Sequence, residues 1–220
     1  MKIGIIGAGN IGGNLTRALT QAGHEVRVAN SRGAETLADL AKETGATAVD
    51  ATQAADGAEV VVVTIPQKAI RDLPAGVLDN AAPGAVVVDT GNYYPQQRDG
   101  RIDAIESGTP ESVWVAEQLG RPVVKCFNGI YAAQLLTDGQ PSGSAGRRAL
   151  PVAGDDAYGK DVVVALLDTI GFDGVEAGPL SESWRQQPGT PVYGAVGNTP
   201  EILRLLGNAS PERAPEWRAS

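Results

Sequence analysis

The stretch KIGIIGAGNIG, residues 2–12, decides the fold of this chain. It opens with a short apolar run that is typical of a buried parallel strand. Three glycines follow in the spacing G-x-G-x-x-G, at Gly7, Gly9 and Gly12. One apolar helix face comes next and ends before Gly23, with Ile11, Leu15, Ala18, Leu19 and Ala22 at helical spacing. A glycine turn between a strand and a helix indicates a dinucleotide-binding unit.

Each glycine of this turn has a separate expected role. Gly7 allows the tight turn, Gly9 lets the backbone approach a pyrophosphate, and Gly12 lets the helix and the strand pack closely. The free N–H groups and the positive dipole end of the helix favour phosphate binding there. The residues predicted to bind the cofactor at this turn are Gly7, Gly9, Asn10 and Ile11. The alternative is a glycine-rich turn without a ligand.

The second predicted strand ends in VRVANSR, residues 26–32. NAD-binding proteins usually carry an acid here that bonds the ribose hydroxyls, and its charge would repel a 2′-phosphate. This chain has Asn30, Ser31 and Arg32 instead. A neutral amide, a hydroxyl and a guanidinium fork suit a phosphate. These residues therefore predict selection of NADP(H), and a solvated surface arginine is the alternative.

Strands and helices alternate along the first two thirds of the chain. Further strands are predicted at 25–30, 46–49, 60–64, 85–89 and 122–127. Helices are predicted at 34–44 and 111–119, and Pro66 suits the first turn of another. This alternation implies right-handed crossovers and helices on both faces of a parallel sheet. We therefore predict an α/β fold, Rossmann-type and doubly wound, with a mainly parallel sheet.

The last third predicts a small C-terminal α/β extension from about residue 150, within a single NADP-binding domain that covers residues 1–220. A strand and turn at 150–156 precede an amphipathic helix at 158–170. Another strand is expected from residue 174, and a helix at 199–206 with Thr199 as its cap. Residues 208–220 are polar and contain proline, which predicts a flexible tail.

Ligands of open α/β sheets lie at the carboxyl ends of the strands. The predicted loops at that edge contain small, apolar and amide residues, namely Thr64, Ile65, Pro66, Thr90, Gly91, Asn92 and Asn128. Residues of these kinds can line a nicotinamide ring but are poor acids and bases. We therefore predict that they surround the nicotinamide, and ordinary loops are the alternative.

Composition argues against several partners. The net charge of -8 and the pI of about 4.7 disfavour nucleic acid or an anionic membrane surface. No apolar run approaches the roughly 18 residues that a membrane span needs. The single cysteine, Cys126, allows no intramolecular disulfide, which favours a cytoplasmic protein.

Catalytic side chains are scarce as well. His24 is the only histidine, and it is expected at the amino end of the second strand, away from the ligand edge. No Ser-His-Asp triad and no histidine metal site are therefore predicted. Cys126 lies in an apolar strand and is expected in the core. Hydride transfer between two held rings is the chemistry that demands least of such a site.

Seven motifs occur in a familiar order: MKIGIIGAGNIG, VANSRG, VVVVTIP, VVDTGN, VVKCFN, LPVAGDD and EAGPLSES. Together they cover residues 1 to about 186 and resemble the NADPH-dependent reductases of the deazaflavin coenzyme F420, the NADP oxidoreductase family. They also resemble the NADPH-binding domain of membrane metalloreductases. GAGN followed by Ile11 is closer to the metalloreductase version than to the GGTG turn of many deazaflavin reductases.

The resemblance implies a second, small-molecule redox substrate, coenzyme F420 or a flavin, whose ring would stack against the nicotinamide. It implies that Ser31 and Arg32 hold the 2′-phosphate. The loops that it implies around the cleft are those at Pro66, Asn92, Asn128 and 178–180. It also implies a homodimer.

The predicted function is thus hydride transfer between NADP(H) and a deazaflavin or flavin-type ring. The aromatic residues that could stack on the acceptor, or pack elsewhere, are Tyr93, Tyr94, Trp184 and Tyr193. A second hypothesis is an imine or small-carbonyl reductase, which would need a proton donor such as one of these tyrosines. A third is a non-catalytic NADP(H)-responsive binding protein.

Overall fold

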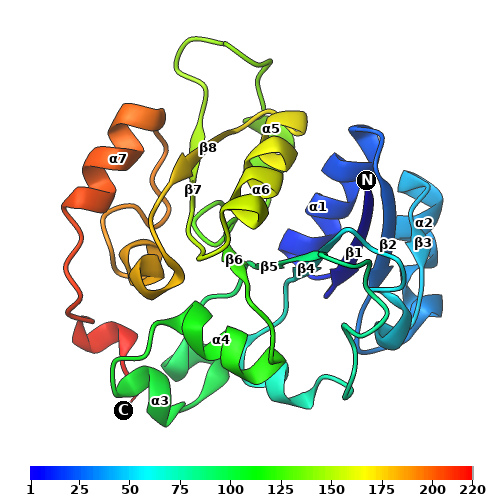
Figure 1. Ribbon diagram of the computed structural model, residues 1–220, viewed down its shortest axis with the longest axis horizontal. Coiled ribbons are helices and arrows are strands. Elements are labelled where there is room, and N and C mark those ends of the chain that lie inside the picture. Colours follow the sequence, from blue (N-terminus) through cyan, green and yellow to red (C-terminus); the bar gives the residue numbers. More distant parts are fainter. Residues whose placement is uncertain (220) are drawn as a thin grey trace.

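A six-stranded parallel sheet forms the centre of the molecule (Figure 1). The computed structural model describes residues 1–219. The strands of the sheet are β1 (Lys2–Ile6), β2 (Glu25–Ala29), β3 (Thr47–Ala48), β4 (Val60–Val63), β5 (Val86–Asp89) and β6 (Val124–Lys125). Their order is β3-β2-β1-β4-β5-β6, and every neighbouring pair is parallel. This order confirms the predicted doubly wound fold, whose switch point lies between β1 and β4.

Helices cover both faces of this sheet. They are α1 (Asn10–Gln21), α2 (Ala38–Thr44), α3 (Asp103–Glu106), α4 (Glu111–Leu119), α5 (Gln134–Thr137) and α6 (Ala157–Thr169). Val60 and Val62 of β4 join one core with residues of α1 and α6, whereas Val61 and Val63 join a second core with residues of α4. Four consecutive buried valines are thus explained by a strand that is covered on both faces. No helix within residues 1–219 is both long enough and apolar enough to pass through a bilayer.

A two-stranded parallel sheet forms the C-terminal extension. β7 (Ala149–Val152) pairs with β8 (Asp173–Glu176), and α6 connects them. An antiparallel bridge between Lys125 and Ala153 joins β6 to the segment after β7. The last α-helix, α7 (Thr199–Gly207), is capped by Asn198, whose Oδ1 accepts from Glu201 N at 3.2 Å. Thr199 is therefore the first helical residue and not the predicted cap, because Asn198 has the extended backbone of an N-cap.

Several predicted elements are shorter or more tightly wound than their patterns indicated. Residues 34–44 begin as a 3₁₀ turn before α2, and Pro66 precedes a 3₁₀ helix as its N-cap. The predicted strand 122–127 keeps only the two ladder residues of β6, because Phe127 has a φ of 64° and ends the extended backbone. Short 3₁₀ helices lie at Ala34–Leu37, Ala51–Gln53, Gln67–Asp72, Leu180–Gln186 and Pro215–Trp217, and a short π-helix lies at Pro95–Asp99.

The C-terminal segment, residues 208–219, lies beside α3 and α4 and is red in Figure 1. Arg213 Nη2 is 2.7 Å from Oε1 of the buried Glu111. Ala219 N donates to Glu106 Oε1 at 2.8 Å. These contacts hold the described part of this segment against α3 and α4. The flexibility predicted for residues 208–220 stays a prediction.

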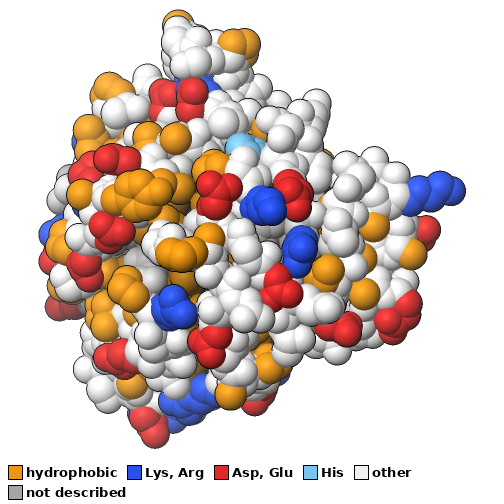
Figure 2. All heavy atoms as spheres, turned by 45° about the vertical axis from the view of Figure 1, so that its right-hand side comes forward, with side chains coloured by type: hydrophobic (Ala, Val, Ile, Leu, Met, Phe, Trp, Pro, Cys, Tyr) orange, Lys and Arg blue, Asp and Glu red, His pale blue; other side chains and the backbone are white. Residues whose placement is uncertain are grey.

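Charges of both signs are interspersed on the face shown in Figure 2. This face carries acidic and basic side chains next to one another, with apolar atoms between them. Such mixing differs from the one-sided basic stripe that nucleic-acid-binding proteins present. The net charge of -8 is therefore not gathered into a single block on this face.

Candidate functional site

The glycine turn joins β1 to α1 as the sequence predicts. Gly7 has a φ of 110°, and its N donates to Ala29 O of β2 at 2.8 Å. A Cβ at Gly7 would lie 2.3 Å from Thr64 O, and one at Gly12 would lie 1.9 Å from Gly7 O. A Cβ at Gly9 would meet nothing within 4 Å. Gly7 and Gly12 are thus required by the protein's own packing, whereas Gly9 faces open space at the start of α1.

The start of α1 offers a place for an anion. Gly9 is the N-cap of α1, and no side chain caps the helix. The first N–H groups of a helix have no partner within it, and the helix dipole places partial positive charge there. The open space at Gly9 therefore fits the pyrophosphate of a dinucleotide.

A cavity of ≈440 Å³ extends from this turn along the carboxyl edge of the sheet. It brings together predicted residues of the glycine turn and of the loops after β4, β5 and β6: Gly9, Asn10, Ile11, Thr64, Ile65, Pro66, Thr90, Gly91, Asn92 and Asn128. Its other lining residues are Tyr94, Arg98, Phe127, Ile130, Tyr131, Ala132 and Tyr193. Ligand pockets commonly have volumes of about 300–1,000 Å³, so this cavity is large enough for part of a ligand.

The loop after β2 lies on the other side of β1 from this cavity. Asn30 Oδ1 accepts from Arg32 N at 2.8 Å, and its Nδ2 donates to Thr36 Oγ1 at 2.9 Å. Those bonds fix the turn, while the side chains of Ser31 and Arg32 are exposed. Because β2 pairs with β1, this exposed arginine and the cavity flank the glycine turn.

Two asparagines tie the loops after β5 and β6 together. Asn92 Nδ2 donates to Asn128 O at 2.8 Å, and Asn128 Nδ2 donates to Asn92 Oδ1 at 3.0 Å. Asn128 Nδ2 also donates to Gln186 O at 2.6 Å. Phe127 precedes Asn128 with a φ of 64°, a conformation that costs a non-glycine residue about 1–3 kcal/mol. The neighbouring loops thus hold an unfavourable backbone at the edge of the cavity.

Buried charges hold the loop that begins at Gly91. Gly91 N donates to Asp89 Oδ1 at 2.8 Å, and Lys125 Nζ donates to Gly91 O. Lys125 Nζ is also 3.1 Å from Asp89 Oδ2, and Ser112 Oγ donates to the same oxygen at 2.7 Å. Lys125 and Asp89 are almost fully buried. The ion pair therefore satisfies both polar backbone groups of Gly91 below the cavity.

A second buried carboxylate continues this support. Glu111 Oε2 accepts from Tyr93 N at 3.0 Å, and its Oε1 accepts from Arg213. Burial raises the pKa of the Glu111 carboxyl, while Lys125 and Arg213 oppose that shift. The C-terminal segment is thereby linked through Glu111 to the loop beside the cavity.

Two tyrosines from distant parts of the chain meet at the cavity wall. The hydroxyls of Tyr94 and Tyr193 are hydrogen-bonded to each other. The ring of Trp217 packs beside both, with centroid distances of 6.1 Å to Tyr94 and 6.2 Å to Tyr193. The Arg98 guanidinium lies 5.0 Å from the centre of the Tyr94 ring. Burial, followed by the Tyr94 hydrogen bond, raises the pKa of Tyr193.

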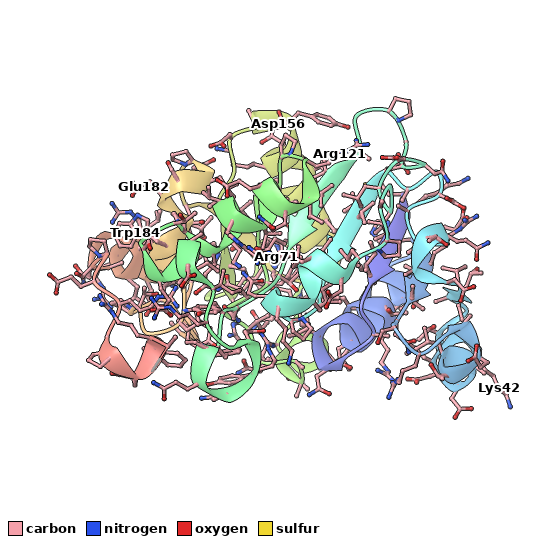
Figure 3. All side chains as sticks on the ribbon, turned by 90° about the horizontal axis from the view of Figure 1, so that it is seen from below. Lys42, Arg71, Arg121, Asp156, Glu182 and Trp184 are labelled. Carbon is pink, nitrogen blue, oxygen red and sulfur yellow. The ribbon has the colours of Figure 1, made fainter. Side chains whose placement is uncertain are left out.

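A smaller hollow of ≈260 Å³ lies among the residues that precede β5 and β6. Arg71 and Arg121, labelled in Figure 3, contribute to its lining. Arg71 stacks 5.1 Å from the ring centre of Trp114 and donates to Gln118 Oε1 at 3.0 Å. This hollow opens at the amino ends of the strands, the edge opposite to the one where such folds bind ligands.

Residues 2–93 match the family model described as NADP oxidoreductase, coenzyme F420-dependent. The crystal structure of a hypothetical protein, SMa0349 from Sinorhizobium meliloti, is 31% identical and aligns with a TM-score of 0.74 over 89% of this chain and 94% of that chain. The chain belongs to this NADP oxidoreductase family. The family resemblance predicted from the seven motifs is thereby confirmed, and the family is one of NADP-dependent oxidoreductases.

Two further proteins are similar to this member of the NADP oxidoreductase family. The crystal structure of a proposed F420-dependent NADP reductase from Arthrobacter sp. FB24 is 25% identical, with a TM-score of 0.70 over 83% of this chain and 87% of that chain. The Escherichia coli K12 protein YjhV is 51% identical over 66 residues. That match spans 30% of this chain and 48% of YjhV, so it covers about half the length of that relative.

Some residues expected near the cleft lie elsewhere in this family member. Tyr93 is fully buried, its hydroxyl accepts from Ile102 N at 2.9 Å, and burial raises its pKa to about 12. Trp184 lies near Glu182 (Figure 3) with the Arg185 guanidinium 4.5 Å from its ring centre, away from the cavity.

Residues 178–180, which were also expected to line the cleft, do not line the cavity. Gly178 O accepts from Gly154 N at 3.1 Å, and Leu180 is buried in the core on the α4 side. The backbone bond holds this segment against the C-terminal extension, where Leu180 faces the core and Pro179 is exposed. Arg98, Phe127, Tyr131 and Ala132 line the cavity but were not predicted. Their only signal was position. Phe127 ends the predicted strand 122–127, Tyr131 and Ala132 follow the loop after it, and Arg98 follows the loop that begins at Gly91.

Proposed function

We propose that the chain transfers hydride between NADP(H) and a deazaflavin or flavin-type ring. The observation that carries this proposal is the cavity of ≈440 Å³ at the carboxyl edge, which begins at the glycine turn. Arg98 is the one ionised side chain among the described residues that line it. A largely neutral cleft suits two stacked rings that exchange hydride, since the protein then mainly supplies proximity and orientation.

The protein's own atoms suggest how NADP(H) would lie. Gly9 and the first N–H groups of α1 would hold the pyrophosphate, with Asn10 and Ile11 beside it. Ser31 and Arg32 would hold the 2′-phosphate beyond the other side of the glycine turn. Asn30 supports that turn without adding a negative charge. The nicotinamide would then enter the cavity on the opposite side.

The loops after β4, β5 and β6 would hold the reacting rings. Thr64, Ile65 and Pro66 would contact the nicotinamide, since they lie beside the glycine turn. Thr90, Gly91, Asn92 and Asn128 line the adjoining part of the cavity. Bound NADPH supplies a hydride from its C4, and these residues hold the acceptor against that atom and exclude water.

An acceptor panel tests the proposed reaction. The absorbance of NADPH is followed with the purified chain and, in turn, coenzyme F420, FMN, FAD, a ferric chelate and cyclic imines. Rapid oxidation with coenzyme F420 or a flavin supports the proposal, and turnover of imines alone favours the imine reductase. Tight NADPH binding without turnover on any acceptor would instead indicate an NADP(H)-responsive binding protein.

Replacement of Arg32 tests the cofactor choice. We expect Arg32→Ala to weaken NADPH binding by about 1.5–3 kcal/mol, the scale of a hydrogen bond to a charged group. NADH binding should hardly change, because NADH has no 2′-phosphate. Fluorescence titration with each cofactor measures both affinities. Arg204→Ala, at an exposed position on α7, is the control, and equal losses of NADPH and NADH affinity in Arg32→Ala would rule out the 2′-phosphate role.

We further propose a homodimer in the cytoplasm. The family resemblance supports the dimer, and the lone, buried Cys126 fits a reducing compartment. Light scattering of the purified chain tests the assembly, because one chain has a mass of 22.7 kDa. A mass of a single chain at micromolar concentration would contradict the dimer.

A further inference from the structure

Hydride transfer leaves the acceptor in need of a proton. When hydride adds to C5 of a deazaflavin, to N5 of a flavin or to the carbon of a carbonyl, an electron pair moves onto another ring nitrogen or onto an oxygen. That atom must then take a proton from a nearby acid. No carboxylic acid and no histidine are found among the described residues that line the cavity. The hydroxyls of Tyr94, Tyr193 and Tyr131 are its phenolic candidates.

The Tyr94–Tyr193 pair is the best ordered of these groups. Tyr94 N donates to Asp99 Oδ2 at 2.8 Å, and the hydroxyl of Tyr94 is bonded to that of Tyr193. Trp217 packs against both rings, which restricts their rotation. Tyr131 is 66% exposed and lies at the rim, where water reaches its hydroxyl.

We propose that Tyr94 is the proton donor to the reduced acceptor and that Tyr193 is a positioning residue that hydrogen-bonds to it. This inference rests on the proposed hydride transfer and deepens it. Tyr94 gives its phenolic proton to the nitrogen or oxygen that has received the electron pair, so a new N–H or O–H bond forms as the Tyr94 O–H bond breaks. NADPH is oxidised to NADP⁺, the acceptor is reduced, and the Tyr94 phenolate regains a proton from water.

The surrounding charges assign the roles within the pair. The Arg98 guanidinium lies 5.0 Å from the centre of the Tyr94 ring, where it stabilises negative charge. Asp99 partly offsets it, since Arg98 Nη2 is 2.9 Å from Asp99 Oδ2. Burial raises the pKa of Tyr193, and Glu111 acts in the same direction. Tyr193 is therefore the member that stays protonated and donates a hydrogen bond to the Tyr94 phenolate.

The test compares two acceptors in Tyr94→Phe and Tyr193→Phe. Coenzyme F420 needs a proton after hydride transfer, whereas the planar cation 10-methylacridinium becomes neutral on accepting hydride and needs none. With coenzyme F420 we expect kcat to fall about 10²-fold in Tyr94→Phe, the lower end of general-acid effects, and about tenfold in Tyr193→Phe. With 10-methylacridinium the kcat of both variants should stay within about threefold of the original chain.

Two further measurements separate this role from a structural one. The NADPH dissociation constant of both variants, measured by fluorescence, should be unchanged. Heavy water should lower kcat of the original chain with coenzyme F420 and not with 10-methylacridinium. Tyr158→Phe, at an exposed position in the first turn of α6, is the matched control and should change none of these values.

The possible failures are distinguishable. An active original chain with an unchanged Tyr94→Phe would overturn the proton-donor role alone. Equal losses of kcat with both acceptors would also overturn it, because they indicate a structural defect. If the original chain failed to oxidise NADPH both with coenzyme F420 and with 10-methylacridinium as the acceptor, the proposed function and this inference would both be contradicted.

Discussion

Gly9→Val is expected to leave the fold intact and to weaken NADPH binding at least about 100-fold. The backbone of Gly9, with φ -74° and ψ -162°, is extended and suits any residue. A Cβ there meets no protein atom within 4 Å. The branched side chain would instead fill the space proposed for the pyrophosphate and remove its backbone contacts. Each charge-assisted contact is worth about 1.5–3 kcal/mol, so the loss of two accounts for the effect. Fluorescence titration with NADPH measures it.

Two other glycines provide matched controls for that variant. Gly12→Ala places its Cβ 1.9 Å from Gly7 O, so it should lower the melting temperature as well as the affinity. Gly207→Ala, at the end of α7, meets nothing within 4 Å and should change neither property. Gly9→Val with a normal melting temperature and normal NADPH affinity would show that the pyrophosphate does not cross this turn.

The main sheet could be predicted because its signals are local. The buried strands β1, β4 and β5 are short apolar runs, and turn residues punctuate them at close range. The order of the strands then follows from the glycine turn and the alternation with helices, both of which are sequence patterns. Elements whose sequence shows little hydrophobic periodicity were harder to predict. The strand predicted at 122–127 shrinks to β6 because the backbone of Phe127 turns, and no local pattern announces a positive φ in a phenylalanine.

The inner part of the candidate site depends on contacts between distant residues. Tyr94 and Tyr193 are 99 residues apart, and Trp217 reaches them from a segment that composition predicted to be loose. Tyr93, the neighbour of Tyr94, looked equally suitable. The strand-like alternation of side chains after β5 turns Tyr93 into the core and Tyr94 toward the cavity. Which aromatic residue faces a ligand is decided by this packing rather than by residue type.

The largely neutral cavity also rests on a buried ion pair whose two members the sequence alone did not identify as partners. Asp89 ends β5 and Lys125 ends β6, in adjacent parallel strands. Their registered pairing sets the carboxylate and the ammonium side by side below Gly91. The pair thus fixes a loop from beneath, where its charges do not face the ligand. The ion pair thus positions the Gly91 loop without adding charge to the cavity. This arrangement favours hydride transfer between two rings.

Lys125→Met is expected to cause the largest loss of stability of any variant considered, about 3–5 kcal/mol. The substitution leaves the carboxylate of Asp89, which is only 1% exposed, without its cation, and unpaired buried charges carry penalties of this size. It also leaves Gly91 O without the Lys125 donor. For a domain of this length the melting temperature should fall by about 6–20 °C. Chemical denaturation and thermal melting, each followed by circular dichroism, measure the change.

The double variant Asp89→Asn/Lys125→Met tests whether the loss comes from the stranded charge. An asparagine Oδ1 can still accept from Gly91 N, so the double variant should regain part of the stability that Lys125→Met loses. Lys42→Met on the exposed surface of α2 (Figure 3) is the control and should change stability by less than about 0.5 kcal/mol. If the double variant were no more stable than Lys125→Met, the penalty would lie in the lost Lys125 donor to Gly91 O and not in the stranded carboxylate of Asp89.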